Sequence, residues 1–110
     1  MAAVPAATLG RDYPAWLTGF DDEDLNFLRR FLLSSGSLKD VAAEYGVSYP
    51  TVRARLDRLI EKARVAEDAR IVDPFERKIR LLAADAKLPA ALARELLEAH
   101  RSALGRREKS

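Results

Sequence analysis

Two short amphipathic segments, each opened by a serine and separated by a glycine, constrain this fold more than any other feature. Apolar residues recur every three to four positions after Ser37, and the same spacing returns after Ser48. Serine is a favoured helix N-cap, and Gly46 suits the left-handed conformation that ends a helix. The pattern therefore predicts two helices joined by a tight turn.

The segment SLKDVAAEYGVSYPTVRARLDRLIEKA, Ser37 to Ala63, is typical of a helix-turn-helix. Ala42 is small where the two helices would cross closely, and Gly46 allows a positive φ in the turn. Val52 and Leu56 would anchor the second helix on its neighbours. This anchoring leaves the opposite face of residues 49–63 exposed and rigid.

A further helix is predicted before this motif, with Asp21 as its N-cap and Ser34–Gly36 at its end. We interpret the acidic residues 21–24 as a solvated capping face, because their spacing lacks the pattern of a calcium loop. The aromatic residues within 13–20 are expected to lie across the domain and fill its core.

Two more helices are predicted after residue 73. Asp73 and Pro74 are a strong start signal, Pro89 starts the next helix, and Gly105 is expected to end it. Residues 65–73 could extend the helix that begins near residue 49 or form a connector.

The expected fold class is all-α, a trihelical helix-turn-helix core with a C-terminal pair of helices. A chain of 110 residues is typical of one domain. We expect a flexible tail over 1–12, the helix-turn-helix domain over 13–64, a C-terminal helical extension over 65–105 and a basic tail over 106–110.

The absence of cysteine excludes thiolate zinc sites, iron–sulfur clusters and cysteine nucleophiles. The single histidine, His100, argues against a histidine metal site or a catalytic triad. No apolar run approaches the ~18–20 residues that span a bilayer, and no secretory signal is evident. We therefore expect a cytoplasmic protein that is not an enzyme, with no cofactor, no metal and no membrane association, and no small-molecule ligand is evident from the sequence.

Positive charge is concentrated in residues 49–64, which hold five basic and two acidic residues in a chain of net charge +2. A rigid basic helix suits the major groove of DNA. The candidate DNA-contacting residues are Lys39, Ser48, Tyr49, Thr51, Arg53, Arg55, Arg58 and Lys62. Asp57 and Glu61 leave an alternative open, in which they pair with Arg53, Arg58 and Lys62 on a merely solvated face.

We expect a transcriptional regulator that binds double-stranded DNA with residues 49–63 in the major groove. One helix-turn-helix makes few contacts, so a homodimer through the two C-terminal helices would place two copies one helical turn apart. Alternatively, the leucines of those helices only complete the core of one monomer. A protein-interaction adaptor that docks a partner through residues 49–63 or the C-terminal helices also remains open, since the net charge is small and residues 1–36 are acidic.

The segment VAAEYGVSYPTVRARL, 41–56, resembles the DNA-reading segment of lac-repressor-type and sigma-factor-type regulators. That likeness places Tyr49, Pro50 and Ala54 at base-reading positions. Pro50 and Ala54 cannot hydrogen-bond a base, which shifts direct readout to Arg53 and Arg55.

From YPAWL to the last helix, the chain also resembles an uncharacterised bacterial family, domain of unknown function two-zero-eight-nine. This resemblance implies a bacterial transcriptional regulator. Members of that family often carry a zinc ribbon before the helix-turn-helix, and a chain without cysteine lacks that module.

Overall fold

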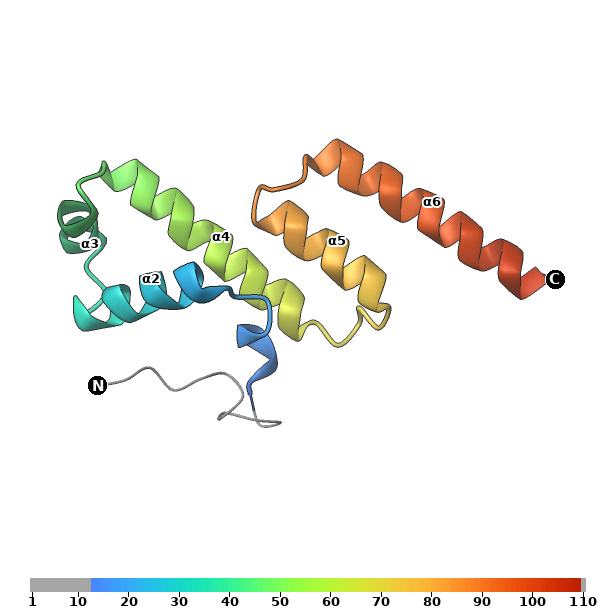
Figure 1. Ribbon diagram of the computed structural model, residues 1–110, viewed down its shortest axis with the longest axis horizontal. Coiled ribbons are helices and arrows are strands. Elements are labelled where there is room, and N and C mark those ends of the chain that lie inside the picture. Colours follow the sequence, from blue (N-terminus) through green and yellow to red (C-terminus); the bar gives the residue numbers. More distant parts are fainter. Residues whose placement is uncertain (1–12, 110) are drawn as a thin grey trace.

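Six helical elements follow one another along residues 13–109, the part of the chain that the computed structural model describes (Figure 1). They are η2 (Ala15–Leu17), α2 (Asp22–Leu33), α3 (Leu38–Tyr45), α4 (Tyr49–Glu67), α5 (Pro74–Ala84) and α6 (Ala90–Lys109). These residues contain no strand, which confirms the all-α helix-turn-helix core with a C-terminal helix pair. The expected tail over 1–12 lies outside the described residues. Within them, no helix combines the length and apolar character needed to cross a membrane.

Polar side chains start the helices where the sequence predicts. The Asp21 carboxylate accepts a hydrogen bond from the Asp24 amide at 2.8 Å, and the Asp24 carboxylate accepts one from the Asp21 amide at 3.1 Å. Ser37 starts α3 in the same way, with its Oγ 3.1 Å from the Asp40 amide. Asp73 caps α5 through the Phe75 amide. These caps satisfy amides that a helix cannot satisfy itself.

Helices α2, α3 and α4 enclose the larger hydrophobic cluster. Its buried members are Phe27, Leu38, Val41, Ala42, Val52 and Leu59. Leu56 and Phe20 pack against this cluster, and η2 packs against α4. The N-terminal aromatic segment therefore reaches the core through Phe20, whereas Trp16 remains 37% exposed.

A second, smaller cluster lies between α5 and α6, where Ile79, Ala93 and Leu97 are buried. Helix α5 lies beside the C-terminal half of α4, with α6 on the far side of α5 (Figure 1). Arg77 joins α5 to the end of α4, because its guanidinium donates to the carbonyls of Val65 and Ala66 at 2.7 and 2.8 Å. It also donates to the carbonyls of Asp68 and Ile71 in the connector.

One helix end differs from the expectation, and the structure defines a second one that the sequence left open. Helix α6 continues through Gly105 to Lys109, because the strong helix formers after Gly105 outweigh a glycine cost of about 1 kcal/mol. Residues 106–109 are therefore helical rather than a separate tail. Helix α4 extends to Glu67 and holds Ala66 buried, so residues 65–67 extend the helix and 68–73 form the connector.

Candidate nucleic-acid interface

The turn between α3 and α4 is closed by backbone and side-chain hydrogen bonds. Gly46 takes the left-handed conformation at φ 67°, and the Val47 amide donates to the Ala42 carbonyl at 3.0 Å. Ser48 Oγ accepts from the Thr51 amide at 3.4 Å and lies 2.9 Å from Thr51 Oγ1. The start of α4 is therefore held in one orientation relative to α3.

Four of the predicted contact residues are exposed around α3 and the start of α4. They are Lys39, Ser48, Tyr49 and Thr51. Tyr49 is 52% exposed and lies at the first position of α4. In Figure 1 this end of α4 lies beside α3, away from α5. Lys39 is on the first turn of α3, at the opposite end of that helix from the turn.

Helical spacing sorts the side chains of α4 that lie outside its apolar core stripe into three rows. The row toward α2 contains Thr51, Arg55, Arg58 and Lys62. The row opposite the core contains Pro50, Ala54, Asp57 and Glu61, and the remaining flank carries Arg53 and Arg64. The outermost row of α4 is therefore acidic, and the basic residues lie on its two flanks.

Lys62 is in the protein interior, which corrects its assignment as a DNA contact. Its side chain is only 4% exposed, and its Nζ contacts Asp24 Oδ2 and lies 3.4 Å from Asp85 Oδ2. The exposure of the first turns does not continue to Lys62, because η2 and α5 pack against α4 and Asp24 of α2 lies against the Lys62 ammonium. A phosphate cannot reach this ammonium in the folded protein.

The sequence interpretation missed Asp24, which is the acidic partner of Arg55 and Lys62. It is 1% exposed. The prediction that residues 21–24 form a solvated capping face is therefore wrong for Asp24. Asp24 precedes Phe27 by three residues and therefore lies on the buried face of α2. This three-residue spacing was the sequence signal that could have predicted the burial of Asp24. Two cations face its carboxylate, since Arg55 Nη2 lies 2.8 Å from Oδ1 and Lys62 contacts Oδ2.

The three arginines predicted to contact DNA differ in how their charges are paired. Arg55 is 28% exposed and bound to Asp24. Arg53 is 53% exposed, with Nη2 3.2 Å from Asp57 Oδ1. Arg58 is half-buried and forms no ion pair with any residue in the described range 13–109. The alternative of acid pairing is thus confirmed for Arg53 with Asp57, whereas Glu61 pairs with Arg64 at 3.7 Å instead.

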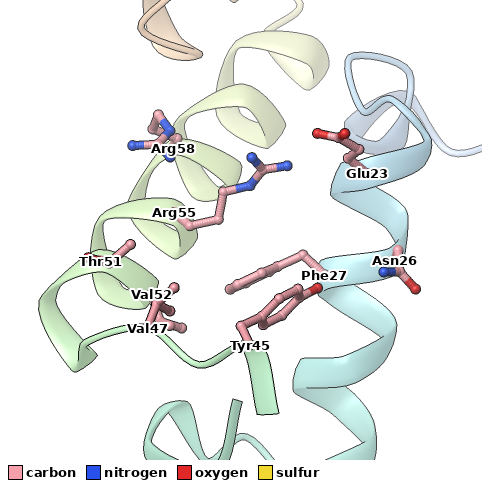
Figure 2. Close-up of a pocket in the computed structure, with 9 residues that line it drawn as sticks. All are labelled: Glu23, Asn26, Phe27, Tyr45, Val47, Thr51, Val52, Arg55 and Arg58. Carbon is pink, nitrogen blue, oxygen red and sulfur yellow. The ribbon is translucent and has the colours of Figure 1, made fainter. Parts of the chain in front are cut away.

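A cavity of about 450 Å³ lies beside Arg55 and Arg58, between α2 and the first half of α4 (Figure 2). Its lining residues are Glu23, Asn26, Phe27, Tyr45, Val47, Thr51, Val52, Arg55 and Arg58. Figure 2 shows the rings of Phe27 and Tyr45 side by side, facing Val47 and Val52. The ring centroids of Phe27 and Tyr45 are 6.2 Å apart in a stacked arrangement.

Comparison with known families decides the class of this segment. Residues 20–65 match the model of the family described as domain of unknown function DUF2089, helix-turn-helix. The DUF2089 match covers α2, α3 and most of α4, and it stops before α5. It confirms the helix-turn-helix and the resemblance to this family over those residues, while the absence of a zinc ribbon stays a prediction. No curated protein and no solved structure shows a significant match to the chain.

Proposed function

We propose that this protein binds double-stranded DNA as a bacterial transcriptional regulator, with the first turns of α4 in the major groove. The observation that carries the proposal is the exposed, hydrogen-bonded start of α4, which α5 and α6 do not cover (Figure 1). The match of residues 20–65 to a helix-turn-helix family supports it. Recognition helices of this class read base edges with their N-terminal residues.

The proposed contact set follows from exposure and charge pairing. Tyr49 and Thr51 would reach bases or phosphates from the first turn of α4, and Ser48 and Lys39 would contact the backbone. Arg53 can exchange Asp57 for a phosphate at little cost, because exposed ion pairs contribute only about 0–1 kcal/mol.

Arg55 and Arg58 have different parts in the proposal. Arg58 is paired with no acid among residues 13–109, so it can bind a phosphate without breaking an ion pair there. Arg55 is held by the buried Asp24, so we assign it mainly to orienting α4 rather than to reading bases.

A double substitution tests the proposal directly. Arg53→Gln/Arg58→Gln should weaken binding of a random duplex in fluorescence anisotropy and reduce the slope of log K against log salt by about 2. Arg70→Gln/Lys87→Gln removes the same charge from exposed loop positions outside α4 and the proposed dimer helices, and it should leave the slope unchanged. Equal binding by the two double variants at low salt would contradict the proposal.

We also propose that the protein acts as a homodimer through α5 and α6. Only Ile79, Ala93 and Leu97 are buried in their shared cluster, while Phe75 and Leu92 remain 44% and 42% exposed. Leu92→Glu should lower the mass measured by light scattering from that of a dimer to that of a monomer. A monomeric unmodified protein would show instead that these leucines only complete one chain's own core.

A protein-interaction adaptor is the second candidate function. The acidic outer row of α4 favours it, because Asp57 and Glu61 would face the phosphates of a bound duplex. Co-purification of a partner that survives high salt, without any shift of duplex DNA, would select this function. In either case we place the protein in the cytoplasm and assign it no catalytic role.

A further inference from the structure

We propose that the cavity between α2 and α4 binds a small molecule with an apolar body and one carboxylate. Phe27 and Val52 are buried at the floor of this cavity, and Tyr45 and Val47 form its exposed walls. Apolar pockets with a few convergent polar groups are typical of small-molecule sites, and a volume of about 450 Å³ lies within their usual range.

The charges at the rim define the head group. Arg55 and Arg58 come from α4 and Glu23 comes from α2. Because the Asp24 carboxylate already holds Arg55, Arg58 is the rim cation that remains available to a ligand. Figure 2 shows the Arg55 side chain extending from α4 toward the side where Glu23 lies. Arg58 forms no hydrogen bond or ion pair with any described residue. A carboxylate would pair with Arg58, because it is the planar acceptor that a guanidinium binds with two hydrogen bonds.

A ligand in this cavity would change the affinity of the protein for DNA, an effect that rests on the proposed function. Arg58 belongs both to the cavity rim and to the proposed phosphate contacts. A carboxylate bound to Arg58 therefore competes with a phosphate for the same guanidinium. The ligand would lower the affinity of the protein for DNA, as an effector does.

The test titrates the full chain with 3-phenylpropionate, followed by ¹H–¹⁵N NMR in the absence of DNA. We expect saturable shifts confined to amides around the cavity, with a Kd of roughly a few millimolar. The neutral analogue 3-phenylpropanamide should bind about fivefold or more weakly, because it lacks the charge that the arginines recognise. A further arm with phenylalanine measures whether an added ammonium near Glu23 strengthens binding.

Matched variants separate the site from general electrostatics. Arg58→Gln should weaken binding of 3-phenylpropionate about fivefold, whereas Arg53→Gln, which lies outside the cavity lining, should leave it unchanged. A dispersed spectrum verifies that each variant is folded. Absence of saturation at about 20 mM, equal binding of the amide, or an equal loss in Arg53→Gln would each overturn the proposal. These outcomes do not depend on DNA, so they are distinct from a failure of the proposed function.

Discussion

Asp24 Oδ1 lies 2.8 Å from Arg55 Nη2, and this contact joins the first turn of α2 to the middle of α4. The carboxylate is almost fully buried, so it depends on Arg55 and Lys62 to balance its charge. Apolar packing alone would allow α4 to shift along α2 by small amounts. The ion pair restricts that movement, because a displaced arginine would leave one oxygen of the buried carboxylate without its cationic partner.

Replacing Lys62 with methionine should lower the free energy of unfolding by about 3 kcal/mol. The substitution keeps the length of the buried stem but leaves Asp24 with Arg55 as its remaining cationic partner, and Asp85 loses a partner as well. Urea unfolding followed by circular dichroism measures the change. Arg64→Met is the matched control, since its ion pair with Glu61 is exposed, and it should change stability by under about 1 kcal/mol. Similar losses in both variants would show that Lys62 does not neutralise a buried charge.

Arg77→Met should destabilise the protein by at least about 2 kcal/mol. The guanidinium donates to four carbonyls at the end of α4 and in the connector, and their loss leaves part-buried acceptors unsatisfied. Thermal unfolding compares this variant with Arg80→Met, which removes an exposed pair with Glu76 from the same helix. The prediction fails if the two variants melt at the same temperature.

The same glycine-to-alanine change should have opposite effects at two positions. Gly46→Ala should destabilise the protein by about 1 kcal/mol, because alanine disfavours φ 67° even though an added Cβ would meet nothing within 4 Å. Gly105→Ala should stabilise it by about 0.5–1 kcal/mol, since Gly105 lies inside α6 with open space around it. Urea midpoints of the two variants check the signs, and a stabilising Gly46→Ala would exclude a strained turn.

The stability supplied by Asp68 should disappear in acid. The side chain and then the amide of Arg70 donate to this carboxylate and lower its pKa from 3.8 to about 2. Because the folded pKa is the lower one, the contribution is present above pH 3.8 and is lost as the pH falls through about 2. The melting temperatures of the wild type and Asp68→Asn should therefore differ near neutral pH and converge toward pH 2. A difference that is constant with pH would contradict this assignment, and Glu61→Gln controls for the loss of one surface charge.

Local signals predicted the start of almost every helix, because they depend on neighbouring residues alone. Asp21, Ser37, Ser48 and Asp73 cap the helices that the sequence assigned to them. The prediction that Gly105 ends the last helix was wrong, because one glycine does not end a helix when the residues after it all favour helix formation. The end of α4 could not be placed, because it depends on Arg77, twelve residues after Val65.

The candidate site was less predictable, because exposure on a long helix depends on what packs against it. Lys62 and Arg58 share a row of α4, and nothing in their spacing shows that only Lys62 is covered. Its burial follows from the positions of α2 and α5, which bring Asp24 and Asp85 to it. The cavity also arises from tertiary packing, between residues that are far apart along the chain.

Separate hydrophobic clusters give the two ends of this protein different resistance to opening. Detaching α6 exposes few buried side chains, namely those it shares with Ile79 of α5, whereas detaching α3 opens the larger cluster around Val41. Amide protons of α6 should therefore exchange with solvent through small local fluctuations, and those of α3 and α4 only through larger ones. The helix-turn-helix can thus keep its shape while the C-terminal pair loosens or changes its packing.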